Sequence, residues 1–130
     1  MMENQMHMTA DAQHAVETFG ALEQDPHGLC AKDGGAKLDA GKHELSLVIC
    51  GFARALLEVG RVSTYGANKY SRNGWITVVD GERRYSDAMY RHLLREALGE
   101  ECDEESGLPH AAHAAWNALA RLDLMLRKAA

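Results

Sequence analysis

Apolar residues recur every three or four positions in the middle of the chain, and this spacing constrains the fold more than any other feature. The members of the row are Leu45, Val48, Ile49, Phe52, Leu56 and Val59. Such spacing puts the side chains on one face of an α-helix, because 3.6 residues make one turn. The sequence therefore predicts an amphipathic helix that begins near Glu44 and ends between Gly60 and Val62.

Residues 63–83 interrupt this periodicity. Their Asn73-Gly74 and Asp80-Gly81 pairs are typical of turns. The short apolar stretch 76–79 between those turns is either a small strand or a packed loop, and the sequence does not decide which.

Two further helices are expected after these turns. One runs from about Arg84 to Leu98, with Gly99 where a helix stop belongs. The other starts near Pro109, a residue tolerated in a first turn, and continues to about Arg127. Alanines crowd its beginning and would let a neighbouring helix approach closely. The fold class predicted from these patterns is all-α, a small bundle of three main helices.

The N-terminal part of the chain has a different expected structure. Residues 1–30 are expected to form a weakly structured arm with a short helix at 12–22, whereas residues 31–130 form the helical domain. Residues 31–43 make a loop that carries three lysines. Lys42 and its neighbours either contact phosphate or simply connect the two parts, since no Walker-type spacing is present.

Charge and cysteine content limit the classes of protein that this chain can belong to. Its 130 residues carry a formal net charge of -5, which argues against binding to a nucleic acid polymer. Its three cysteines have no paired spacing, as in a reducing compartment. No apolar run reaches membrane-spanning length, and no signal peptide is evident. We therefore expect a cytoplasmic protein without a membrane partner.

Histidines form the main candidate site. His110, His113, Asn117 and Arg121 fall on one stripe of the last predicted helix, and His92 shares a helix face with Glu96. A lone histidine on such a face is usually a satisfied core residue. Two imidazoles three residues apart can instead present themselves to one ion or one phosphate. We therefore predict that these two helix faces converge on a site.

Other charged residues have two possible roles each. Asp87 is either a ligand to a metal or water, or the partner of Arg91 one turn later. The clustered carboxylates of the acidic connector at 99–107 repel one another unless a cation or arginines neutralise them. Within it, Asp103 or Ser106 would also serve to cap the following helix.

The segment before the second helix offers groups for a nucleotide. Lys69 and Arg72 are suited to phosphates, and Tyr65 is one of three aromatic residues suited to stacking on a base. The other two, Tyr70 and Trp75, are expected in the core.

Four segments together resemble a known family. They are KLDAGK at 37–42, YGANKYSRNGW at 65–75, RRYSDAMYRHL at 83–93 and GEECDEESGLPHAAHAAWNAL at 99–119. The family is the bacteriophage dATP/dGTP diphosphohydrolase N-terminal domain family, related to the MazG-like all-α NTP pyrophosphohydrolases. The resemblance spans residues 37–126.

This resemblance implies metal-dependent hydrolysis of purine deoxynucleoside triphosphates, dATP and dGTP, to the monophosphate and pyrophosphate, in the host cytoplasm for a phage-encoded chain. Mg²⁺ is the first expectation for the metal, although imidazole ligands suit Mn²⁺ or another transition metal. The expected metal ligands are Asp87, Glu96, Asp103, His110 and His113. The expected catalytic groups are Glu96, His92 and His110. We expect the phosphate groups to be bound by Lys42, Lys69, Arg84 and Arg91. We expect the base or sugar to be bound by Tyr65, Asn73 and Asn117.

Two alternatives stay open beside the enzyme. The first is a non-catalytic nucleotide-binding or regulatory phage protein, and the second is a purely structural helical dimer. An HD-type phosphohydrolase is disfavoured because the chain has no His-Asp dipeptide. Three helices leave more apolar face than one layer buries, so we expect a homo-oligomer, either a dimer or a tetramer, to complete the bundle.

Overall fold

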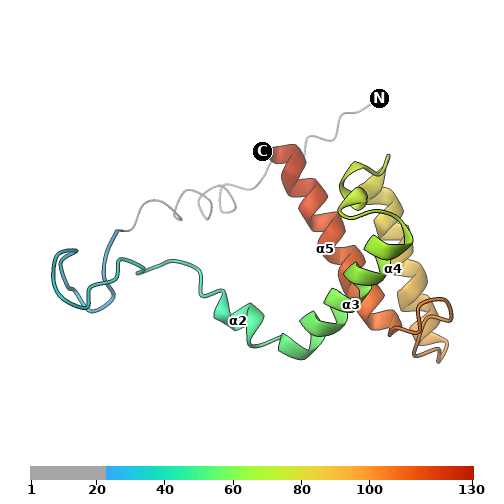
Figure 1. Cartoon of the computed structure of the whole chain (residues 1–130), viewed down its shortest axis with the longest axis horizontal. Helices are drawn as coiled ribbons and strands as arrows, with labels where there is room; N and C mark the ends of the chain where they lie inside the picture. The colour runs from blue at the N-terminus through green and yellow to red at the C-terminus, as the bar shows by residue number, and fades with distance from the viewer. Residues whose placement is uncertain (1–22) are drawn as a thin grey trace. The chain divides into compact units, whose positions relative to one another are not determined.

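The computed structural model describes residues 23–130, and their regular structure is helical (Figure 1). The elements are α2 (Ser46–Ile49), α3 (Ala53–Lys69), the 3₁₀-helix η1 (Gly74–Thr77), α4 (Gly81–Ala97) and α5 (His110–Ala129). In this part of the chain the one β-type contact is an isolated bridge between Cys102 and Pro109. The all-α class and the three main helices are therefore confirmed.

The chain divides into two compact units, Met1–Ser46 and Leu47–Ala130. In the first unit, the described residues form turns around the carboxylate of Asp25. This carboxylate accepts backbone N–H bonds from Lys37 at 2.8 Å and from His27 at 2.7 Å, and the bond from Lys37 is the main cause of its lowered pKa. The short helix expected at 12–22 lies outside the described residues, and the expected boundary at residue 30 stays a prediction.

The first predicted helix differs from the structure by a break inside it and by its C-terminal end. It is interrupted at residues 50–52, so α2 and α3 are separate elements. Gly51 lies at the break, and an added Cβ there would come within 2.2 Å of the Leu47 carbonyl oxygen. The helix then continues past Val62 to Lys69, into the segment where the apolar periodicity of the sequence is interrupted. Burial of Val62 and packing of Tyr65 at the core explain the extension, since tertiary contacts override weak local propensity.

The other two helices lie close to their predicted positions. α4 ends at Ala97, and Gly99 adopts φ +93°, the left-handed conformation expected of a C-terminal stop. α5 begins one residue after Pro109. The undecided stretch 76–79 is not a strand, because η1 covers its first half and Asn73 turns the chain into η1 with φ 58°.

α5 is the central helix of the C-terminal unit, and it packs most extensively on α4 and less on α3 (Figure 1). Its alanines 112, 114 and 120 are buried, as the alanine-rich start had suggested, and small side chains permit close helix packing. Val62 of α3 and Leu108 of the connector pack against Ala112. The rest of the interior is polar or aromatic, which gives the α4–α5 interface its chemical character.

Much of the apolar surface of the C-terminal unit stays exposed. Exposed side chains in α2 and at the break after it are Leu47, Val48, Ile49 and Phe52. Among the described residues, no large side chain is completely buried. None of the described helices combines the length and the apolarity needed to cross a membrane.

Candidate functional site

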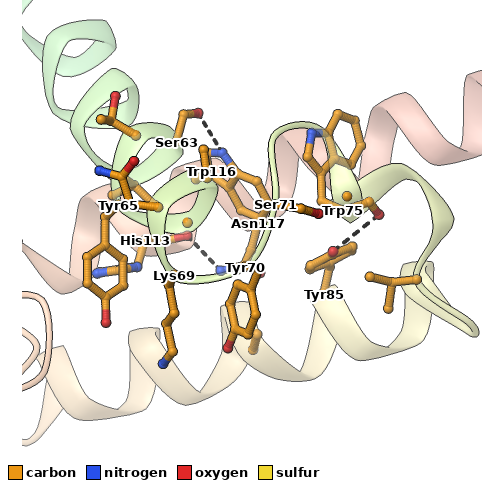
Figure 2. A pocket seen from close by; sticks show the side chains of 18 of the residues that line it. Ser63, Tyr65, Lys69, Tyr70, Ser71, Trp75, Tyr85, His113, Trp116 and Asn117 are labelled. Atoms are coloured by element: carbon orange, nitrogen blue, oxygen red, sulfur yellow. Dashed lines mark hydrogen bonds between the residues drawn. The ribbon is translucent and has the colours of Figure 1, made fainter.

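A pocket with a volume of about 860 Å³ lies in the C-terminal unit (Figure 2). Its walls come from the second half of α3, the segment that follows it through η1, the middle of α4, the acidic connector and the first half of α5. Ligand pockets of small molecules span about 300–1,000 Å³, so this volume suits a nucleotide.

Aromatic side chains gather around the pocket. Tyr65, Lys69 and Tyr70 project in the same direction from the end of α3 (Figure 2). Tyr70 is 77% exposed, so our expectation that it belongs to the core was wrong. Trp75 does pack as expected, since its ring meets Trp116 edge-on at 6.0 Å between ring centroids. The pocket thus offers both an exposed ring and a packed aromatic wall.

Trp116 fixes the aromatic wall from α5. Its indole N–H donates a hydrogen bond to Ser63 Oγ of α3 at 2.8 Å, and its ring meets Tyr85 of α4 edge-on at 5.6 Å. The Tyr85 hydroxyl donates to the Trp75 carbonyl oxygen at 3.2 Å (Figure 2). These contacts tie three elements to α5 around one side of the pocket.

A cation and a carboxylate pair at another side of the pocket. Lys69 forms an ion pair with Glu105 of the connector, and Tyr65 hydrogen-bonds the same carboxylate. The bond to Glu105 raises the pKa of Lys69, and the bond from Lys69 lowers the pKa of Glu105. Burial, followed by the Glu105 contact, raises the pKa of Tyr65. Lys69 therefore stays protonated at neutral pH, as a phosphate-binding lysine must.

The predicted convergence of histidines from two helices is present. His92 of α4 faces His110 of α5, with 2.9 Å between their Nδ1 atoms. The His92 ring also stacks on His113, with 4.5 Å between centroids and 9° between planes. Burial and then the two neighbouring imidazoles lower the pKa of His92 to about 4, and burial also lowers that of His113. Both rings are therefore neutral at pH 7 and keep a lone pair for a proton or a metal.

The connector holds its carboxylate against these rings through a tight turn. Asp103 Oδ2 accepts the backbone N–H of Ser106 and its hydroxyl, each at 2.9 Å. Although burial opposes the change, these two bonds lower the pKa of Asp103. Ser106 Oγ lies 2.7 Å from His113 Nε2. Because the hydroxyl proton goes to the carboxylate, His113 donates its Nε2 proton to Ser106 and its Nδ1 is unprotonated.

Three of these groups are placed to share one cation. Donor atoms of His92, Asp103 and His110 all lie within 4.8 Å of one another. On the far side of His110, its Nε2 atom lies 3.6 Å from a carboxylate oxygen of Glu100. The two nitrogen donors and one oxygen donor fit a divalent metal, so the metal implied by the family resemblance has a matching set of donors in this chain.

Other predicted site residues line the same pocket. They are Tyr65, Lys69, Asn73, Arg84, Asp87, Arg91 and Asn117. Asn117 is buried one turn after His113, and its amide donates to the His113 carbonyl oxygen at 2.8 Å. Asp87 pairs with Arg83 at 3.3 Å, one turn earlier on α4, in place of the Arg91 that we had considered.

Three predicted residues do not line the pocket, namely Glu96, Lys42 and His110, although His110 contacts the lining residue His92. Glu96 is exposed on the last turn of α4, away from the cluster of His92, Asp103 and His110. Because α5 begins opposite His92, it offers no residue opposite Glu96 one turn further along. Our prediction that Glu96 shares the histidine site is therefore not supported. Lys42 belongs to the first unit, and its phosphate contact stays a prediction.

The sequence reasoning missed two functional neighbours, Ser106 and Glu105. Ser106 had been considered only as a helix cap, yet α5 has no side-chain cap and Ser106 bridges Asp103 and His113. The three-residue spacing of Asp103 and Ser106 is typical of such a turn and was the available signal. Nothing in the sequence indicated that Glu105 pairs with Lys69, 36 residues away.

Fold and site together define an all-helical protein whose pocket joins aromatic rings and cations to a histidine–carboxylate cluster. The chain belongs to the family described as dATP/dGTP diphosphohydrolase, N-terminal, which it matches over residues 32–130. It is also 42% identical over 81 residues to a protein named dATP/dGTP diphosphohydrolase from Salmonella phage PMBT28. That match covers 62% of this chain and 26% of the relative, so the chain spans about a quarter of the relative's length. No solved structure matches the chain.

Proposed function

We propose that this chain hydrolyses purine deoxynucleoside triphosphates, dATP and dGTP, to the monophosphate and pyrophosphate with the help of a divalent metal. Family membership and the name of the phage relative support this assignment. The observation that carries it is one pocket that is lined by aromatic rings, by basic side chains and by His92 and Asp103 of the histidine–carboxylate cluster. A nucleoside triphosphate needs all three kinds of group.

The cations of the pocket match the charge of the triphosphate. Lys69, Arg84 and Arg91 come from two elements and line the same space. As the bond from the α-phosphorus to the leaving oxygen breaks, negative charge moves onto pyrophosphate, and nearby cations stabilise it. The exposed ring of Tyr70 is the side chain that we assign to stacking on the purine, because a planar base covers such a ring without displacing the core.

His113 is the group that we assign to accept the proton of the attacking water. It lines the pocket, it is neutral at pH 7, and Ser106 and Asp103 fix its proton on Nε2. Nδ1 is then the nitrogen that takes a proton, and the Asp103 carboxylate at the end of the chain of hydrogen bonds stabilises the resulting imidazolium. A bound metal would acidify the water and polarise a phosphate oxygen.

The test is release of pyrophosphate from the four deoxynucleoside triphosphates and the matching ribonucleotides, with a panel of divalent metals. We expect turnover of dATP and dGTP. Arg91→Met should lower kcat/KM at least about tenfold, because one charge that stabilises the transition state is lost. Arg54→Met is the matched control: Arg54 is an exposed arginine of α3 outside the pocket lining, and its loss should leave turnover unchanged.

The same assay separates the enzyme from the regulatory alternative. Tight binding of dATP or dGTP by the folded chain without pyrophosphate release would favour a nucleotide-binding regulator. Neither binding nor turnover would remove the nucleotide assignment altogether.

A further inference from the structure

The facing imidazoles of His92 and His110 have a spacing that matches ligands of one metal ion. Metal–nitrogen bonds of about 2.0–2.1 Å put two nitrogens about 2.9 Å apart at a right angle and about 3.4 Å apart at the tetrahedral angle. The observed separation between the two Nδ1 atoms is 2.9 Å. A carboxylate oxygen of Asp103 and one ring nitrogen of each of these two histidines lie within 4.8 Å of one another.

Without a metal, the histidine pair leaves one buried nitrogen unsatisfied. His110 is 3% exposed, and its Nε2 has no hydrogen-bond partner among the described residues. If His92 donates its Nδ1 proton to His110, the Nε2 proton of His110 is buried without an acceptor. If His110 donates instead, its Nε2 lone pair is buried without a donor. Either tautomer carries the free-energy cost of a buried unpaired polar group.

A metal on the two Nδ1 atoms would select one of these states for His110, the one with its proton on Nε2. Both rings then carry their proton on Nε2, and the Nε2 atom of His110 lies 3.6 Å from a carboxylate oxygen of Glu100. A carboxylate that orients a metal-bound histidine in this way is the usual arrangement in proteins. Glu100 is itself held by Arg95 at 2.9 Å.

We propose that His92, Asp103 and His110 bind one first-row transition-metal ion, with Glu100 as the residue that positions His110. Two imidazoles and one carboxylate suit Zn²⁺, Co²⁺, Mn²⁺ or Fe²⁺, whereas Mg²⁺ prefers an all-oxygen shell. The three protein ligands leave coordination positions for water or phosphate oxygen, since the cluster adjoins the pocket through His92 and Asp103. The proposal identifies the ion of the hydrolase site and rests on the proposed function for its biological role.

The experiment measures metal binding directly, in the absence of nucleotide. The metal-free full chain is titrated with Co²⁺, and binding is followed by visible d–d absorption and by the shift in melting temperature. We expect one Co²⁺ per chain, displacement by Zn²⁺, and no displacement by an equal concentration of Mg²⁺. His92→Gln and Asp103→Asn should each weaken Co²⁺ binding at least about tenfold.

Controls keep the test decisive. Glu104→Gln removes an exposed carboxylate beside Asp103 and should leave Co²⁺ affinity unchanged. Because His110 is buried, we use the half-buried His92 as the main ligand variant and check its fold by circular dichroism. Glu100→Gln should weaken binding by a smaller factor than His92→Gln, since Glu100 acts through His110.

The outcomes also separate this proposal from the hydrolase assignment. A folded chain that binds no Co²⁺ or Zn²⁺, or that binds them equally well as the folded His92→Gln variant, overturns the metal site. A chain that binds Co²⁺ through these residues but releases no pyrophosphate keeps the metal site and loses the hydrolase.

Discussion

Two regions of the C-terminal unit differ in whether they bury polar or expose apolar side chains. Between α4 and α5, His110, His113 and Asn117 are buried and hydrogen-bonded, and one of these bonds joins His113 to Ser106 of the connector. In α2 and at the break before α3, apolar side chains such as Phe52, which is 61% exposed, face outward. The interior of one region is polar, and the surface of the other is apolar.

The difference shows what hydrophobic periodicity does and does not determine. The row of apolar residues from Leu45 to Val59 is the strongest periodic signal in the sequence, yet most of its side chains are exposed in the described part of the chain. The helices α4 and α5 have weaker apolar patterns, yet they pack against each other through their small and polar side chains. Regularity of spacing predicts a helix face, whereas burial depends on what lies opposite.

Replacing Trp116 tests the packed region and should give the largest effect. The ring contacts Trp75 and Tyr85, and its N–H is bonded to Ser63. Trp116→Ala should lower the free energy of unfolding by about 3 kcal/mol, toward the low end for aromatic truncation because the ring is only partly buried. Urea denaturation in dilute protein measures this change.

Leu57→Ala is the control from the other region. Leu57 is 72% exposed on α3, so its truncation should cost less than about 0.5 kcal/mol. Equal costs at the two positions would show that the packed and exposed regions are not energetically different.

The exposed apolar segment is tested by adding a charge. Residues 45–53, LSLVICGFA, contain no charged residue that would oppose pairing of identical chains, and we infer that a second copy of this chain covers them. Phe52→Glu should then weaken self-association at least about tenfold, measured by sedimentation or light scattering over a range of concentrations.

Leu94→Glu provides the comparison for this variant. Leu94 is an exposed leucine on α4, outside the segment, and a glutamate there should leave association unchanged. A wild-type chain that stays monomeric at all concentrations, or an equal effect of Leu94→Glu, contradicts the inference.

Much of the fold was predictable because local rules governed it. Gly99 ends α4 and Pro109 precedes α5 through backbone preferences that a sequence states directly. The continuation of α3 to Lys69 was not predictable in this way. It depends on the packing of Val62 and Tyr65 at the core, which only the assembled fold provides.

The candidate site was predictable to the extent that helix periodicity set it. Helical spacing alone was enough to predict that His92 lies opposite His110 and His113. It failed for Glu96, since the point where α5 begins decides which turn of α4 has a neighbour. It also failed for Ser106, whose role arises in an irregular turn without periodicity.

Alanine substitutions at two glycines, Gly60 and Gly81, compare the two regions through the smallest expected change in stability. An added Cβ at Gly60, within α3, meets no atom within 4 Å, whereas at Gly81 of α4 it would lie 2.8 Å from Leu124 Cδ1 of α5. Gly60→Ala should stabilise the chain by about 0.5–1 kcal/mol, because alanine favours helix and lowers the entropy of the unfolded chain. Gly81→Ala should instead destabilise it by about 0.5 kcal/mol, since Leu124 must shift and a first helical position gains little from alanine. Thermal unfolding of the two variants should therefore move the melting temperature in opposite directions, by about 2–4 °C for each 0.5 kcal/mol. If both variants melt higher than wild type, α4 and α5 are not in close contact at Gly81, and the contrast between the packed and the open region fails at this point.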